Sequence, residues 1–227
     1  MTIPRWQGVL FDLDGTLVDS IPLIIASYDH ALTSVLGQGR PEPEVRGWIG
    51  RTLTSVFEQE YPERAAELES TYIAWNRANA ATMIGRYDGV HDLLVGLSDA
   101  QARFGVVTSK RRATAREALV LAGADDLVDV LAASEDTSEH KPLPAPLLHG
   151  AARLSVPAEG CAYVGDAVVD VQAAKAAGMT SIAVTWGAAD AATLEAAAPD
   201  HLVHTAYELH DLLLGAAGSG GDTQAMG

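Results

Sequence analysis

Cysteine and aromatic side chains are scarce in this sequence of 227 residues. Cys161 is the single cysteine, so an intramolecular disulfide is excluded and a reducing compartment is expected. Aromatic residues make up 6% of the chain and hydrophobic residues 48%. A core must therefore be filled mainly by alanine, valine and leucine, and the length allows one large domain or a core with a modest insertion.

Positively charged residues are also few, with 15 Lys and Arg against 30 Asp and Glu and a formal net charge of −15. Binding to nucleic acid or to an anionic membrane requires clustered Lys and Arg, so the composition argues against both partners. An anionic substrate must instead be bound by local positive groups or a metal ion, against the field of the whole protein.

Long hydrophobic runs are absent. No segment reaches the roughly 18 consecutive apolar residues expected of a membrane-spanning helix, and residues 1–6 carry no basic-then-apolar targeting pattern. We therefore expect a soluble, cytoplasmic protein that acts on a small molecule. The sequence leaves both a monomer and a homodimer open.

One short stretch carries the strongest chemical signal. Gly8 to Phe11 is an apolar run that predicts a buried strand, because it is too brief for a helix and ends in turn residues. Asp12 and Asp14 follow, so strand periodicity directs both carboxylates to one side, and Gly15 allows a sharp turn. Like charges this close repel unless a cation or a shared proton stabilises them, and Mg²⁺ prefers such oxygen ligands. The same residues could also form an ordinary solvated Asp-Gly turn.

The rest of the chain divides into a helical region and an alternating region. Residues 19–86 show helical patterns throughout, whereas in residues 87–214 short apolar runs alternate with helical periodicity. The predicted strands in this second region are 104–108, 128–132, 162–166, 180–185 and 201–203. The predicted helices are 21–36, 41–50, 52–61, 63–84, 90–97, 112–121, 145–154, 168–177 and 206–214.

Alternation of this kind predicts an α/β fold, a Rossmann-like, doubly wound parallel sheet with helices on both faces. Residues 1–18 and 87–214 would form this core. Residues 19–86 would form an all-helical cap over the carboxyl ends of the strands, where such sheets bind ligands. A cap so placed can exclude water and select substrates. Residues 215–227, rich in Gly, Ala and Ser, are expected to be disordered.

Three further segments place polar groups where strands or loops end. Thr108 and Ser109 follow a predicted strand, where hydroxyls and backbone N–H groups bind phosphate oxygens, although they could equally cap the next helix. Asp166 and Asp170 follow another strand, where carboxylates suit both Mg²⁺ and a helix N-terminus. Lys141, in a loop before a helix, could be an ordinary solvated lysine.

Taken together, four segments resemble the four motifs of the haloacid dehalogenase superfamily. The segments are Phe11–Ser20, Val106–Lys110, His140–Pro144 and Tyr163–Asp170. The resemblance is to the phosphatase form, because the haloacid dehalogenases themselves lack the second aspartate, here Asp14. It implies a small helical cap, phosphoryl chemistry and Mg²⁺ as cofactor. Relatives often have a small hydroxyl residue at the position of Ala167. The hydrogen bonds that such a hydroxyl would make around Asp166 are therefore not expected in this chain.

The resemblance also implies roles for individual residues. Asp12 would be the nucleophile that forms an aspartyl-phosphate, and Asp14 the general acid and base. Lys141 would offset the negative charge of the nucleophile and the phosphoryl group. The implied phosphate-binding residues are Thr108, Ser109 and Lys110. The implied Mg²⁺ ligands are Asp12, the backbone carbonyl of Asp14, Asp166, and Asp170 directly or through water.

The substrate is less clearly indicated. Gly50–Leu53 resembles a cap loop of phosphoglycolate phosphatases, in which Arg51 would pair with a substrate carboxylate or second phosphate, although it could be a surface arginine. Residues 107–112 also resemble the pyrophosphatase of the same subgroup. We expect a small phosphoglycolate-like monoester, with pyrophosphate and sugar phosphates as alternatives. A phosphotransferase resembling β-phosphoglucomutase and a non-catalytic phospho-ligand-binding module are the remaining hypotheses.

Overall fold

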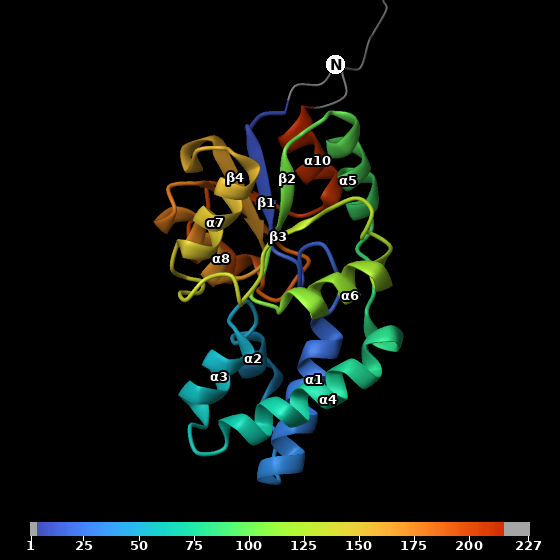
Figure 1. The fold of residues 1–227 in the computed structure, drawn as a ribbon, viewed down its shortest axis with the longest axis vertical. Helices are drawn as coiled ribbons and strands as arrows, with labels where there is room; N and C mark the ends of the chain where they lie inside the picture. Colours follow the sequence, from blue (N-terminus) through green and yellow to red (C-terminus); the bar gives the residue numbers. More distant parts are fainter. Residues whose placement is uncertain (1–3, 216–227) are drawn as a thin grey trace, which may run out of the picture.

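The computed structural model describes residues 4–215 and shows a sheet with helices on both faces and four helices beyond one end of the sheet (Figure 1). Apart from Gly215, the tail predicted to be disordered lies outside the described residues. Within residues 4–215, the structure has no helix that is long and apolar enough to cross a membrane.

Six parallel strands form one sheet in the order β3-β2-β1-β4-β5-β6. The strands are β1 (Gly8–Phe11), β2 (Phe104–Val107), β3 (Val130–Ala132), β4 (Cys161–Gly165), β5 (Thr180–Val184) and β6 (His201–Val203). The chain winds outward from β1 to β3 and then outward from β4 to β6, so the strand order reverses between β1 and β4. Ligands bind at such a reversal, beyond the carboxyl ends of the strands. The predicted doubly wound α/β fold is confirmed.

Two helical layers bury the two faces of the sheet. In β1, Val9 and Phe11 belong to one core cluster and Leu10 to the other, as the period of two along a strand requires. The first cluster lies under α5 (Val90–Asp99), α6 (Arg112–Ala122) and α10 (Ala206–Leu214). The second lies under α7 (Ala145–Leu154) and α8 (Val168–Ala176), on the opposite side in Figure 1.

The four helices beyond the sheet have a hydrophobic core of their own. They are α1 (Ile21–Leu36), α2 (Glu42–Arg46), α3 (Leu53–Glu60) and α4 (Ala65–Met83). Tyr28 lies at the centre of this core, with its ring centroid 4.8 Å from that of Tyr72, 5.3 Å from Trp48 and 5.5 Å from Phe57. Much of the small aromatic content is thus concentrated in this region, where it packs the four helices against one another.

The chain enters and leaves the helical region at adjacent points. Asp19 and Gly85 exchange two backbone hydrogen bonds, with N···O distances of 3.2 Å and 2.8 Å. The chain therefore passes between the sheet and the helical region through two connections that lie side by side. The division at residues 18/19 and 86/87 stays a prediction, which these adjacent connections support.

One α-helix, α9 (Ala191–Ala196), was absent from the predicted elements. It has six residues, of which only Leu194 is buried, so its sequence has no detectable helical period. Its local signal is the cap, because the Asp190 carboxylate accepts a hydrogen bond from the backbone N–H of Thr193 at 2.7 Å. A single 3₁₀ turn at Ala158–Gly160 was missed for the same reason of length.

Candidate active site

The carboxyl ends of β1, β2 and β4 bring the predicted site residues to one edge of the sheet. Asp12 directly follows β1, and its backbone N–H extends the pairing with β4 by donating to the carbonyl of Val164 at 2.8 Å. Gly15 has a φ of +79°, and a Cβ there would lie 2.1 Å from Oδ2 of Asp166. The turn after β1 can therefore approach the end of β4 only with glycine at this position.

Three buried carboxylates meet at this edge. Asp12, Asp166 and Asp170 each place a carboxylate oxygen within 4.8 Å of the others. Oδ1 of Asp166 accepts a hydrogen bond from Oγ1 of Thr16 at 2.8 Å, and Oδ2 accepts one from the backbone N–H of Ala188 at 2.7 Å. The structure thus brings together three of the residues that the sequence singled out as metal ligands.

Lys141 supplies the one ammonium group of this cluster. Its Nζ lies 3.1 Å from Oδ1 of Asp12 and 2.7 Å from Oδ1 of Asp170, and its side chain is 1% exposed. Burial alone would lower the pKa of Lys141. The charges of Asp12 and Asp170 outweigh this effect and hold the pKa well above its usual range. Lys141 is therefore not the solvated lysine that its loop position also allowed.

Tyr163 is a member of the cluster that sequence reasoning missed. Its hydroxyl accepts a hydrogen bond from Nζ of Lys141 at 3.1 Å and donates one to the carbonyl of Val107 at 3.0 Å. The available signal was a tyrosine inside an otherwise aliphatic buried strand, because a buried phenol group needs a hydrogen-bond partner.

Three carboxylates around one ammonium leave an excess of negative charge, which suits a divalent cation. Oδ1 of Asp12 is buried, and among the described residues its close partner is the ammonium of Lys141 at 3.1 Å, in a geometry that is not that of a hydrogen bond. Burial raises the pKa of Asp12 to about 7, with Lys141 opposing the increase and the charges of Asp170 and Asp14 adding to it. Burial and the same kind of repulsion raise the pKa of Asp166 well above its usual range. An oxygen-preferring cation such as Mg²⁺ fits this donor set.

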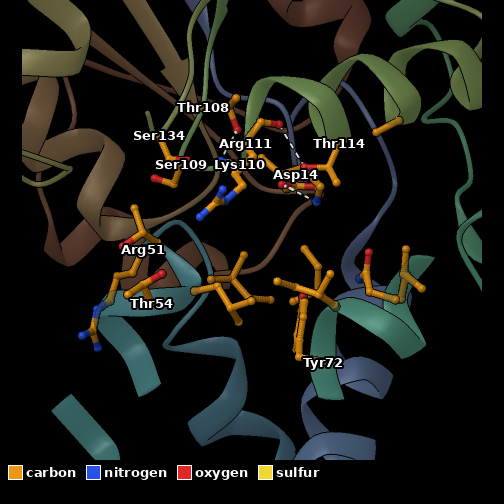
Figure 2. Close-up of a pocket in the computed structure, with 18 of the residues that line it drawn as sticks. Asp14, Arg51, Thr54, Tyr72, Thr108, Ser109, Lys110, Arg111, Thr114 and Ser134 are labelled. Carbon is orange, nitrogen blue, oxygen red and sulfur yellow. Dashed lines mark hydrogen bonds and ion pairs between the residues drawn. The ribbon is translucent and has the colours of Figure 1, made fainter. Parts of the chain in front are cut away.

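Asp14 lies outside the carboxylate cluster. Nζ of Lys110 binds both of its oxygens, at 2.7 Å and 2.9 Å (Figure 2). The hydroxyl of Ser20 donates to Oδ1 of Asp14. Lys110, predicted to bind phosphate, is therefore paired with the predicted general acid. Ser20 was recognised only as part of the first motif, because the contact depends on how the turn after β1 folds back.

The two hydroxyls after β2 have different environments. Oγ1 of Thr108 accepts a hydrogen bond from the backbone N–H of Lys110 at 3.2 Å. The hydroxyl of Ser109 donates to the carbonyl of Gly50 at 2.7 Å, so it contacts the helical region. Thr108 and Ser109 both line the cavity described next.

A cavity of about 770 Å³ separates the strand ends from the helical region. Figure 2 shows Thr108 and Asp14 on the sheet side and Arg51 and Tyr72 on the helical side. The Arg51 side chain extends away from Asp14, and its guanidinium donates to the carbonyl of Ser55 at 3.3 Å and to Oε1 of Gln59 at 2.7 Å. Arg51 therefore lines the cavity while its charged end is bound to α3.

Comparison with known proteins gives consistent matches over most of the chain. A model of the family described as haloacid dehalogenase-like hydrolase matches residues 9–184. Pyrophosphatase PpaX from Bacillus velezensis is 35% identical over 210 residues, covering 92% of this chain and 97% of that protein.

Solved structures with the same fold are also found. A predicted phosphatase from Clostridium acetobutylicum has a TM-score of 0.81 at 26% identity, covering 91% of this chain and 97% of its own. A predicted phosphoglycolate phosphatase from Haemophilus somnus has a TM-score of 0.79 at 24% identity, and the match covers 90% of this chain and 96% of that protein's chain. This likeness shows that the two share the fold.

The charge excess predicts a pH-dependent stabilisation by Mg²⁺. Without a cation, the pKa of Asp12 is about 7, compared with its usual 3.8. The folded state then binds more protons than the unfolded state between these values, so its stability falls as pH rises through this window. Mg²⁺ at about 100 times its Kd should add about 2.7 kcal/mol at pH 8, or roughly 5–10 °C in Tm, and less at pH 5.5, where protons compete.

Thermal unfolding in Mg²⁺ and in EDTA at the two pH values measures this effect. The variant Asp166→Asn should lose most of the Mg²⁺ response. An equal increase in Tm at pH 5.5 and pH 8 would contradict the assignment of the cation to these carboxylates.

The buried ion pairs predict a second, structural effect. Lys141→Met should lower the free energy of unfolding by about 3–5 kcal/mol, because it leaves buried carboxylates without their ammonium partner. Adding Asp170→Asn should recover a large part of this loss, since it removes one of the unpaired charges. Urea unfolding of the single and double variants measures both values, and a double variant no more stable than Lys141→Met would refute this account.

Proposed function

Because this chain belongs to the haloacid dehalogenase-like hydrolases and is a phosphatase of that family, we propose that it hydrolyses a small phosphate monoester through an aspartyl-phosphate on Asp12, with Mg²⁺ as cofactor. The observation that carries the proposal is the position of Asp12. It lies at the end of the central strand, beside Lys141, and lines the cavity where a substrate can enter.

The reaction follows from the two environments of Asp12 and Asp14. A carboxylate oxygen of Asp12 attacks phosphorus, an oxygen–phosphorus bond forms, and the bond to the leaving oxygen breaks. Asp14, on the cavity side and outside the buried cluster, gives a proton to the leaving oxygen. It then takes a proton from the water that cleaves the aspartyl-phosphate and releases inorganic phosphate.

The surrounding residues position and stabilise the transferring group. Lys141 holds the Asp12 carboxylate and offsets its charge, and Thr108 and Ser109 lie beside the cavity to orient phosphate oxygens. Lys110 and Ser20 hold the carboxylate of Asp14 on the cavity wall.

Mg²⁺, when bound, would neutralise negative charge on the transferring group. Asp12, Asp166 and the backbone carbonyl of Asp14 would hold it. Asp170 suits a water-mediated role, because its Oδ1 is bound to Lys141 and its Oδ2 accepts from the backbone N–H of Ala167 at 3.0 Å.

We propose that residues 19–86 act as the cap of this site. The α4 residues that line the cavity are Glu69, Tyr72, Ile73, Asn76, Arg77 and Ala80. Their spacing of three and four places them on one face of α4, so the helix presents a continuous wall to the substrate. A wall of this kind can exclude water from the aspartyl-phosphate and select the leaving group.

A phosphoglycolate-like monoester is favoured by the shape of the cavity. Its volume of about 770 Å³ leaves room for an organic group beyond the phosphate, and Ile49, Leu53 and Ile73 give part of its wall an apolar character. The guanidinium of Arg51 is engaged by α3, so contact with a second anionic group of the substrate would require it to exchange partners.

Pyrophosphate is the second candidate, favoured by the similarity to the pyrophosphatase from Bacillus velezensis. We also propose a cytoplasmic location, supported by a single, buried cysteine. Both candidate substrates are small phosphorylated molecules, so a small phosphorylated metabolite is the partner that we propose.

Substrate choice is tested by Mg²⁺-dependent phosphate release from phosphoglycolate, pyrophosphate, sugar phosphates and nucleotides. We expect phosphoglycolate or a similar small monoester to exceed the others by about a hundredfold in kcat/KM, or about 2.7 kcal/mol. A preference of that size for pyrophosphate would establish the second candidate instead. Isomerised product without free phosphate would contradict hydrolysis.

The nucleophile is tested by Asp12→Asn, which should lower kcat by several orders of magnitude, because the amide cannot form the covalent intermediate. The Tm in the absence of Mg²⁺ should stay at or above that of the unchanged protein, since a buried charge is removed. Asp125→Asn, at an exposed position, is the matched control and should retain full activity. Normal turnover by Asp12→Asn would overturn the assignment.

A further inference from the structure

The segment Arg46–Gly50, which we call the docking segment, joins the helical region to three loops of the sheet core. It begins at Arg46, the last residue of α2, and α2 lies on the side of the helical region that faces the sheet core in Figure 1. Its contacts are with Ser109 after β2, with the turn between β4 and α8, and with Ala188 after β5.

Gly50 is the residue of the docking segment that lies against the sheet core with no room for a side chain. Its carbonyl accepts the hydrogen bond from Ser109, its φ is +92°, and a Cβ at this position would lie 2.7 Å from Cγ2 of Val169 and 3.1 Å from Cβ of Ala167. The docking segment can therefore take this position only with glycine at residue 50, for reasons of both backbone conformation and space.

Ala188 connects the docking segment to Asp166. Its backbone N–H donates to Oδ2 of Asp166 at 2.7 Å, and its carbonyl accepts from Nη1 of Arg46 at 3.4 Å. Ala188 is buried and belongs to the hydrophobic cluster of the helical region, with Trp48 and Ile49. A single residue thus binds a carboxylate of the candidate metal site and packs in the core of the helical region.

The turn after β4 makes a second connection. Ala167 lies against Gly50, and its backbone N–H donates to Oδ2 of Asp170. Both carboxylates that follow β4 are therefore oriented by backbone groups that the docking segment contacts.

We propose that seating of the docking segment on the core positions Asp166 and Asp170 for the cation, so that closure of the helical region and binding of Mg²⁺ favour each other. Ala188 and Gly50 are positioning residues in this coupling. The inference rests on the proposed Mg²⁺ site. Because coupling between two binding events is reciprocal, Mg²⁺ should also hold the docking segment in place.

The test compares Gly50→Ala with Gly37→Ala. Gly37 has a similar φ of +78° but no atom within 4 Å of a Cβ, so it reproduces the backbone strain without the contact to the core. Calorimetric titration of the substrate-free protein with Mg²⁺ should show a Kd about tenfold weaker for Gly50→Ala, within the usual range of such coupling. The Kd of Gly37→Ala should match that of the unchanged protein.

Two further measurements keep the proposal testable if Gly50→Ala folds poorly. Ala188→Gly removes the methyl group that packs in the helical region but keeps the N–H that binds Asp166, and it should weaken Mg²⁺ binding more than the neighbouring Ala189→Gly. Amide hydrogen exchange at residues 46–50 should slow when Mg²⁺ is added to the unchanged protein.

The outcomes separate the two proposals. Equal Mg²⁺ affinity of the unchanged protein, Gly50→Ala and Ala188→Gly would overturn the coupling alone, as would equal weakening in Gly37→Ala and Gly50→Ala. Failure of the unchanged protein to bind Mg²⁺ would overturn the proposed cofactor together with the coupling.

Discussion

The gathering of three carboxylates in a buried site is the constraint on which the active-site structure depends. Charges removed from water are costly unless they are paired and hydrogen-bonded. The ammonium of Lys141 pairs with Asp12 and Asp170, and Asp166 and Asp170 each receive a hydrogen bond from a backbone N–H group. The remaining negative charge makes this edge of the sheet suited to a cation, which supports the proposed Mg²⁺ site.

Two aspartates separated by one residue acquire different chemistry from this environment. Asp12 is buried, with a pKa raised to about 7, whereas Asp14 is bound by Lys110 and Ser20 on the cavity wall. Gly15 allows the chain to turn between the cluster and the cavity, because a side chain there would collide with Asp166. The two roles proposed for these aspartates, nucleophile and general acid, therefore depend on one tight turn.

The helical region completes the site from the other side of the cavity. Its core of aromatic side chains makes it a compact unit, and it joins the sheet core through two adjacent connections and the docking segment. The backbone of Ala188 contacts both Arg46 and Asp166, and Ser109, whose hydroxyl donates to the carbonyl of Gly50, lines the cavity. Closure and ligand binding can consequently influence each other through short, well-packed contacts.

The sequence by itself determined the parallel sheet, most of the helices and the edge at which the functional residues lie. These features depend on hydrophobic period and on short turn motifs, which are local, and parallel strands bring their carboxyl ends to a common edge. The short helix α9 escaped detection because six residues with one buried side chain carry no period.

Only the tertiary structure decided which partner each polar side chain takes. Lys110 binds Asp14, 96 positions away in the chain, and Ser109 binds the carbonyl of Gly50, 59 positions away. Tyr163 and Ala188 became part of the site through packing alone. Hydrogen bonds and ion pairs form only within a few ångströms and in defined directions, so they depend on how elements distant in sequence are packed, which no local pattern specifies.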